Sequence, residues 1–322
     1  MTHGDRTIPG SMPASPGSRP CCMLQPDTIH PIIGPPIEAI YDLTEIGDHQ
    51  YGAGMKQYLK GLEVSGLLYT CSLGFVDLGH TRETTDYTWY YFNWIRRKQK
   101  DKSGDTFQIS YDRGGTVTIK KDIPQNDHIR VARSIAYDQG LFHEITSYWV
   151  PGVGNHTSSF SPEDLVSNFV GTYIAERAIK ALKAGKYTGD FNKAATAELL
   201  IFLKRVKTLP KNKAIEAFDQ IKGRWVASKD FSDPRYLKRR NFNVAPIVPW
   251  LVLDEPACKP LTLPPDFKKD FPPDTKTFYE IEFNVGGTTL KTSEFDREIK
   301  KIKTQAGKPE ADGGYGSNFD QP

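Results

Sequence analysis

The sequence has no long apolar run and no large excess of charge of either sign. No segment approaches the roughly 18 apolar residues of a membrane-spanning helix, and the first residues lack the apolar centre of a signal peptide. The 42 Lys and Arg residues nearly balance the 39 Asp and Glu residues. We therefore expect no transmembrane segment and no nucleic-acid partner. The sequence as written indicates the cytoplasm, or an extracytoplasmic compartment if a signal peptide has been removed.

Cysteine is scarce, and its placement excludes two common uses. The four cysteines, Cys21, Cys22, Cys71 and Cys258, are too few and too irregularly spaced for a zinc ribbon or a disulfide-rich scaffold. Neighbouring Cys21 and Cys22 do not pair easily with each other. Buried thiols, a disulfide from one of them to Cys71 or Cys258, and a metal or redox role all stay open.

Three common catalytic signatures are also absent. The Gly-Gly pairs at 114–115 and 286–287 fit hairpin turns better than a phosphate-binding loop. No GxSxG motif provides a nucleophilic serine. A second histidine four residues after His143 would complete a zincin motif, but that position is Ser147.

The densest group of chemically active side chains lies between Gly66 and Trp94. Residues 66–71, GLLYTC, form an apolar and aromatic run that predicts a strand. Asp77 is suited to cap a helix, and the proline-free sequence after it predicts a helix through Arg97. A strand followed directly by a helix therefore carries most of the candidate chemistry.

The predicted helix presents two polar pairs. His80 and Glu83 are three residues apart and Arg82 and Asp86 are four apart, so the members of each pair share a face. Arg82 and Asp86 fit either a surface ion pair, which contributes little to stability, or a functional site.

A second helix is predicted from about Asp127 to Trp149. Small and apolar residues precede His143 at helical spacing, so we expect its side chain to point inward. A buried histidine needs a hydrogen-bond partner. His143 is therefore either a core histidine bonded to a backbone carbonyl, or a ligand or general base.

A third helix is predicted to begin near Ser161. Ser161 fits the N-cap, Pro162 fits the first helical position, and Glu163 and Asp164 suit the positive end of the helix. That interpretation explains Asp164 without assigning it any chemistry. Asn168, one turn further, has no such explanation.

The remaining segments complete an α+β fold with a mainly helical core, small peripheral β-hairpins and long Pro-rich extended segments. We expect an N-terminal arm over residues 1–60, a single globular domain over 61–305 with its motif core at 66–185, and a disordered tail over 306–322. The finer predictions are a short helix within 37–47, a hairpin within 105–123, helices within 194–209 and 213–223, an extended segment from about 230, a strand at 277–285 with a hairpin partner, and a last helix at 293–303.

Several motifs occur in one order: RPCC, YTCSLGFVDLGHTRETTDYT, HEITSYW and SSFSPEDLVSNFVGTYIAERA. Together they resemble the bacterial family called domain of unknown function 4056, over roughly Arg19 to Ala184 and more weakly near Trp250. The family implies no particular reaction. The family's motif residues correspond here to Cys21, Cys22, Cys71, Asp77, His80, Arg82, Asp86, His143, Glu144, Ser161, Asp164 and Asn168.

Two histidines on separate helices with carboxylates nearby are suited to hold zinc or iron. We therefore predict a metal-assisted hydrolase acting on an unknown small molecule or polymer, with its pocket between these helices. The predicted metal ligands are His80, His143, Asp77 and Asp86; the catalytic residues are Glu144, His143 and Arg82; and the further pocket residues are Cys71, Asp164 and Asn168. On this prediction the two imidazoles lie within roughly 12 Å of each other.

Two other functions stay open. Cys71 fits a thiol hydrolase with His80 or His143 as its base, although a cysteine late in a strand lacks the activation of a helix N-terminus. The polar residues also fit a buried network in a non-enzymatic binding or structural protein, in which Glu144 pairs with a cation such as Arg82. The sequence leaves the substrate, the metal and the oligomeric state undetermined.

Overall fold

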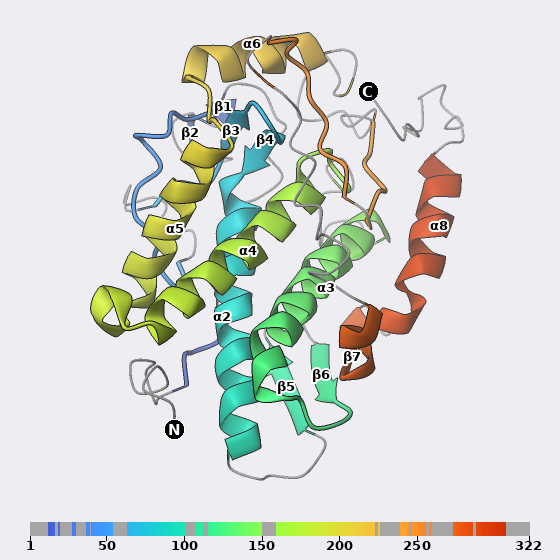
Figure 1. Ribbon diagram of the computed structural model, residues 1–322. Coiled ribbons are helices and arrows are strands. Elements are labelled where there is room, and N and C mark those ends of the chain that lie inside the picture. Colours follow the sequence, from blue (N-terminus) through green and yellow to red (C-terminus); the bar gives the residue numbers. More distant parts are fainter. Residues whose placement is uncertain are drawn as a thin grey trace.

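The computed structural model describes residues 12–16, 19, 28–29, 37–38, 40–53, 63–100, 107–111, 115–149, 159–222, 225, 239–244, 247–255, 258, 273–285 and 288–306. The fold is α+β and mainly helical, as the sequence predicts (Figure 1). The longer helices are α2 (Leu78–Lys100), α3 (His128–Trp149), α4 (Asp164–Lys183), α5 (Phe191–Arg205), α6 (Lys211–Ile221) and α8 (Phe295–Ala306). Among the described residues, no helix is both long and apolar enough to cross a membrane.

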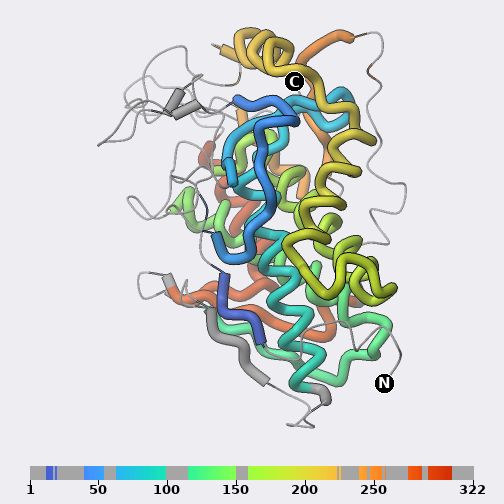
Figure 2. Tube along the Cα trace, turned by 90° about the vertical axis from the view of Figure 1, so that its left-hand side faces the viewer, coloured from blue at the N-terminus to red at the C-terminus, as the bar shows by residue number. Residues whose placement is uncertain are grey.

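Three helices, α2, α3 and α4, pack against one another at the centre, and α5 covers α4 (Figures 1 and 2). Asp77 caps α2 as predicted, because its Oδ1 accepts the backbone N–H of Gly79 at 2.6 Å and of His80 at 3.2 Å. Close approach of α4 to α2 requires Gly171, where a Cβ would lie 2.0 Å from Thr81 O. Side chains on neighbouring faces of these helices therefore meet at short range.

A hairpin leads directly into α2. Strands β3 (Leu67–Thr70) and β4 (Gly74–Asp77) are antiparallel, with Tyr69 opposite Phe75. The sequence predicts only the first of them. Gly74 turns the chain with a φ of 67°, and a Cβ there would lie 2.1 Å from Trp250 O. The tight turn explains how two strands fit into a segment that reads as one strand and a linker.

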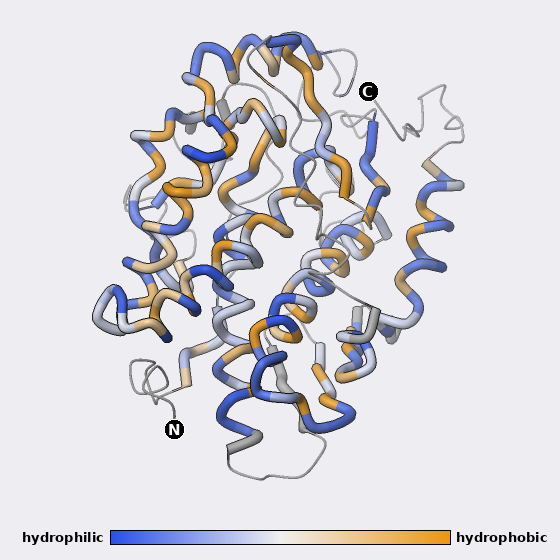
Figure 3. The backbone as a smooth tube through the Cα atoms, in the orientation of Figure 1, coloured by the Kyte–Doolittle hydropathy of each residue, from blue (hydrophilic) through white to orange (hydrophobic). Residues whose placement is uncertain are grey.

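A four-stranded antiparallel sheet contacts α3 through one of its inner strands. Its order is β5 (Phe107–Tyr111), β6 (Gly115–Ile119), β7 (Tyr279–Val285) and β8 (Thr288–Lys291). Both hairpins are predicted from the sequence, whereas the pairing of β6 with β7 joins segments far apart in the chain. Helix α8 packs beside α3 and alternates hydrophilic and apolar residues (Figure 3), with Ile299 and Ile302 turned inward.

The short helix predicted within residues 37–47 is wrong. The segment instead contains strand β2 (Ile37–Glu38), which pairs with β1 (Thr28–Ile29), and a bridge from Ile40 to Leu67. The backbone N–H of Tyr41 donates to Leu67 O at 3.0 Å, so long-range pairing with β3 replaces the local hydrogen bonds of a helix. Most of the predicted arm, the extended segment after 230 and the tail lie outside the described residues.

Candidate functional site

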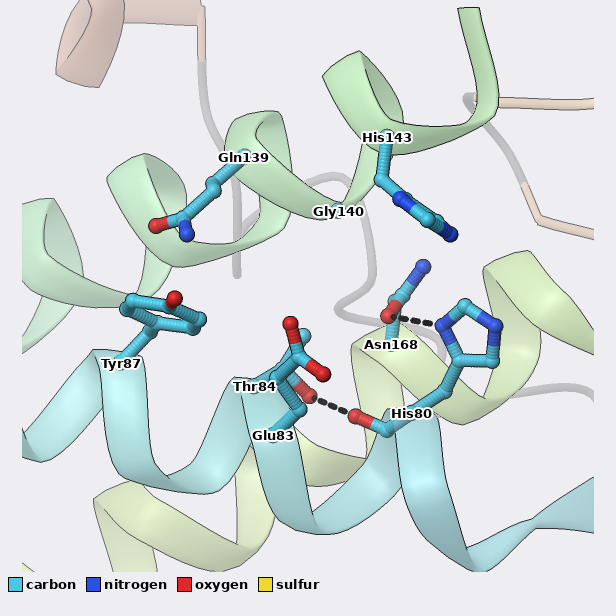
Figure 4. Close-up of a pocket in the computed structure, with 8 residues that line it drawn as sticks. All are labelled: His80, Glu83, Thr84, Tyr87, Gln139, Gly140, His143 and Asn168. Carbon is cyan, nitrogen blue, oxygen red and sulfur yellow. Dashed lines mark hydrogen bonds between the residues drawn. The ribbon is translucent and has the colours of Figure 1, made fainter. Parts of the chain in front are cut away.

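The two predicted site histidines lie side by side. His80 comes from the first turn of α2 and His143 from the last turns of α3, and their ring centroids are 5.9 Å apart (Figure 4). This confirms the prediction that the two imidazoles share one pocket. His80 is buried, whereas His143 is half-buried. The pair therefore connects the interior of the helical core to the pocket between α2 and α3.

Glu144 reaches the same place as the two histidines. One ligand atom from each of His80, His143 and Glu144 lies within 4.8 Å of the others. His143 and Glu144 are consecutive on α3, so their Cα–Cβ bonds point about 100° apart. Their side chains nevertheless converge on that of His80 from α2. Glu144 Oε2 also accepts the backbone N–H of Phe160 at 2.8 Å. The arginine that acts on Glu144 is Arg240 rather than Arg82, so a structural network in which Glu144 lies near a cation stays open.

Side chains of helix α4 lie against both ring nitrogens of His80. Asp164 Oδ1 lies 3.3 Å from His80 Nε2, and Asn168 Oδ1 lies 3.1 Å from His80 Nδ1. Asp164 and Asn168 are one helical turn apart, so a single face of α4 supplies both contacts. Asp164 and Asn168, both predicted as further pocket residues, thus contact His80, and a helix-end charge alone does not account for Asp164.

The start of α4 also differs from the prediction. The helix begins at Asp164, and the hydroxyl of Ser161 donates to Glu163 Oε2 instead of capping the helix. Asp164 Oδ2 accepts the backbone N–H of Ser161 at 2.9 Å. These two contacts with Ser161 orient Glu163 and Asp164, and the side chain of Glu163 lies in the interior.

Glu163 is a site residue that the sequence interpretation missed. It is buried, and burial together with the nearby charge of Asp77 raises the pKa of Glu163 to about 8. Burial also raises the pKa of Glu144, although the charge of His80 opposes this shift. The two glutamates join Asp77 and Asp164, so four buried carboxyl groups lie near His80.

Arg82 and Asp86 lie in a different cluster, so their assignment to the histidine site is wrong. Arg82 donates to Ile46 O at 2.7 Å and faces Glu63 Oε2 at 3.1 Å. Both Arg82 and Asp86 have an exposed fraction of 0 %, which also excludes the surface ion pair. Relative to His80 they point about 200° and about 240° around the helix axis, because each residue turns about 100°.

This second cluster joins three parts of the chain. Asp86 accepts from Arg19 at 2.7 Å and from the backbone N–H of Gly52 at 2.8 Å, and lies 2.8 Å from His49 Nε2. Arg19 also pairs with Glu63 at 2.6 Å. The sequence motifs include Arg19, but only the fold shows that it enters the core.

Cys71 and Asp77 have structural contacts. Cys71 forms a disulfide with Cys258, which gives it a structural role and leaves no free thiol for a Cys71-dependent hydrolase. Cys21 and Cys22 lie outside the described residues. Asp77 caps α2, and its carboxylate lies at the edge of the site beside Glu163.

A narrow pocket opens next to the histidines between α2, α3 and α4 (Figure 4). Glu83 and Tyr87 on α2 and Gln139 on α3 line it, and none of the three is among the predicted site residues. Helical spacing is a signal that would have found two of them, because Glu83 and Tyr87 follow His80 by three and seven residues. The complete lining is His80, Glu83, Thr84, Tyr87, Gln139, Gly140, His143 and Asn168.

The fold and the site together define a mainly helical α+β protein with a buried histidine and carboxylate cluster beside a pocket. The chain matches the model of the family described as Protein of unknown function (DUF4056) over residues 10–248. It belongs to this family. No curated protein and no solved structure matches the chain.

Proposed function

We propose that this protein is a metal-assisted hydrolase whose divalent ion, zinc or iron, is bound by His80, His143 and Glu144, with Asp164 beside them. The observation that carries the proposal is the convergence of one ligand atom from each of the first three residues to within 4.8 Å of one another. Imidazole and carboxylate are the usual ligands of catalytic zinc and of non-haem iron. Within the described residues, this is the one group that meets that distance.

The spacing of His80 and Asp164 also suits an ion. Bonds of about 2.0–2.1 Å in a tetrahedral arrangement place neighbouring ligand atoms roughly 3.3 Å apart. The separation of His80 Nε2 from Asp164 Oδ1 is 3.3 Å. An ion bound by His80 Nε2 therefore has room for Asp164 as a neighbouring ligand without a change in the separation of these two atoms.

Asn168 prepares His80 for this role. Because an amide oxygen carries no proton, the contact from Asn168 Oδ1 requires the proton of a neutral His80 to be on Nδ1. The lone pair is then on Nε2, which faces Asp164. Metal-binding histidines are commonly oriented in this way by a hydrogen bond from the other ring nitrogen.

The charge of the cluster supports a cation as well. The four carboxyl groups of Asp77, Glu144, Glu163 and Asp164 are each at most 2 % exposed. The charge of Arg240 lowers the pKa of Glu144, but it does so less than the charge of His80. Buried negative charge in this amount is costly unless it is protonated or neutralised by a cation.

The proposed chemistry is attack of water on a substrate bond. A bound divalent ion would lower the pKa of a water molecule and polarise the bond to be broken. Glu144 is placed either to hold the ion or to accept the proton of that water. His143, which is half-buried, lies between the ion position and the pocket, where the substrate would enter.

The test combines metal analysis with hydrolysis, using protein purified without a histidine tag. We expect about one zinc or iron per chain and hydrolysis of a chromogenic ester, both lost in His143→Ala. The matched control is His128→Gln on the same helix, because His128 Nε2 instead contacts Ile123 O at 3.1 Å. Equal metal content in His143→Ala and the wild-type protein would contradict the proposed site.

A further inference from the structure

The pocket contains two side-chain amides whose donors face inward. Asn168 Oδ1 is held by His80 Nδ1 at 3.1 Å, and Gln139 Oε1 accepts from Tyr91 Oη at 2.7 Å. Each contact fixes the amide oxygen and turns the NH₂ group toward the pocket, as Figure 4 shows for Asn168 and Gln139. The two residues are 1 % and 5 % exposed.

Both NH₂ groups still need acceptors. Within the part of the chain that the structure describes, neither Asn168 Nδ2 nor Gln139 Nε2 has a hydrogen-bond partner. A buried donor without an acceptor destabilises the folded protein. A fold that holds two such donors at one pocket is suited to a ligand with acceptor oxygens.

Glu83 determines which acceptors fit. Its carboxylate lies between the two amides in the pocket, and one of its oxygens accepts the backbone N–H of Arg19 at 3.1 Å (Figure 4). An anionic ligand would be repelled by Glu83 and by the carboxylates behind His80. A neutral group with both an acceptor oxygen and an N–H donor can satisfy one of the two amide NH₂ groups and Glu83 together.

We infer that this pocket recognises an uncharged carboxamide group of the substrate, whose carbonyl oxygen accepts from Asn168 or Gln139 and whose N–H donates to Glu83. The inference rests on the proposed hydrolase function and narrows its substrate to small amides in place of phosphate esters or carboxylates. The pocket is narrow, and the donors are shielded from solvent. Entry therefore requires the half-buried side chain of Glu83 or His143 to turn aside.

Binding of acetamide tests this inference without any turnover. Acetamide, acetate and methyl phosphate are titrated into the full chain, and the side-chain NH₂ signals of Asn168 and Gln139 are followed by NMR. We expect acetamide to shift both signals in a saturable way, with binding at least tenfold tighter than that of either anion. No shift with acetamide, or tighter binding of an anion, overturns the inference.

Variants sharpen the measurement. Gln139→Glu replaces a donor by an acceptor of the same shape and is expected to weaken acetamide binding about tenfold, the loss of one hydrogen bond. Glu83→Gln is expected to allow acetate to bind. Gln220→Glu, exposed on α6, is the matched control and leaves both ligands unaffected.

The outcome is independent of the hydrolase test. Acetamide binding in a protein without metal or turnover would leave carboxamide recognition standing while the proposed function falls. Hydrolysis of a phosphate ester without acetamide binding would keep a hydrolase and overturn the carboxamide specificity alone.

Discussion

At the scale of single residues, Asn168 links the proposed metal site to the pocket. Its amide oxygen fixes His80, and its Nδ2 presses against α3, where a Cβ on Gly140 would lie 2.8 Å away. The side chain therefore cannot move without disturbing the imidazole or the helix contact. Sequence spacing placed Asn168 one turn after Asp164, and the structure supplies the reason why both residues matter.

Replacing this amide tests its effect on metal binding. We predict that Asn168→Leu weakens zinc binding about 10–100-fold, because His80 loses the acceptor that sets its tautomer. Equilibrium dialysis against a zinc chelator measures the affinity. Asn212→Leu, exposed on α6, is the matched control. Equal zinc affinity for Asn168→Leu and the wild type would show that the contact does not orient His80.

The disulfide gives a prediction for stability. Cys258→Ser is expected to lower the free energy of unfolding by about 2–5 kcal/mol, since the bond to Cys71 closes a loop with a sequence separation of 187. Urea unfolding with and without reductant measures the change. The wild type should lose a similar amount in reductant, whereas Cys258→Ser should not respond. Stoichiometric thiol labelling of folded, untreated protein at Cys71 would contradict the disulfide.

At the scale of elements, α2 separates two polar clusters by its helical phase. His80, Glu83 and Tyr87 face the pocket, while Arg82 and Asp86 face the N-terminal segments. The sequence was sufficient to predict the helix, its cap and the approach of the two histidines. The separation of the clusters agrees with the helical phase, since about 100° per residue turns Arg82 and Asp86 away from His80.

Other features depend on contacts between distant segments, which local sequence patterns do not encode. Glu63 and Arg19 meet Arg82 and Asp86 across long stretches of chain. Strand β4 is not apparent from the sequence, because it follows β3 directly after a turn at Gly74. That turn lies in close contact with Trp250, which is distant in the sequence. Motif resemblance grouped residues of both clusters together, and only the packing of the helices separates them.

The contact between α2 and α4 yields a test whose sign is informative. Replacing Gly by Ala inside a helix ordinarily stabilises by about 0.5–1 kcal/mol. Gly171→Ala is instead expected to destabilise by about 1–3 kcal/mol, because its Cβ would lie 2.0 Å from Thr81 O and from Thr84 Oγ1. Urea unfolding gives the sign directly. A stabilised variant would show that the helices are further apart.

At the scale of the whole molecule, a charge network fastens the N-terminal segments to the helical core. Arg19, His49, Glu63, Arg82 and Asp86 are all at most 4 % exposed. Burial opposes ionisation of Asp86, but the charges of Arg19 and His49 outweigh it and hold the pKa of this carboxyl below its ordinary value of 3.8. The non-enzymatic alternative, a buried polar network, describes this cluster better than it describes the histidine site.

Low pH should weaken the attachment of the N-terminal segments to the helical core. Burial is likewise outweighed at Glu63, where Arg19 and Arg82 hold the pKa below 4.5. In acid, folded Glu63 and Asp86 release protons that the same residues of the unfolded chain still bind. The contribution of the two carboxylates to the free energy of unfolding is therefore complete above their ordinary pKa values. It is lost as the pH falls through their lower pKa values in the folded state. We predict that the free energy of unfolding decreases progressively below a pH of about 4.5.

The variant Asp86→Asn isolates this effect. It is expected to cost about 3–5 kcal/mol at neutral pH, because Arg19 loses a buried partner, and to reduce the acid dependence. Glu163 acts in the opposite sense, since its pKa of about 8 adds stability that is lost as the pH rises from 4.5. Denaturant unfolding below a pH of about 4.5 is therefore free of its influence. An unchanged acid dependence in Asp86→Asn would contradict the assignment.

The most direct measurement of the central claim is a crystal structure of protein purified without a histidine tag and supplied with zinc, with data recorded on both sides of the zinc absorption edge. The claim predicts an anomalous peak about 2.0–2.2 Å from His80 Nε2, from a ring nitrogen of His143 and from a carboxylate oxygen of Glu144. Crystals of Glu144→Gln prepared and measured in the same way serve as the control and should show a weaker peak. No peak between α2 and α3, or zinc bound only elsewhere, would contradict the claim.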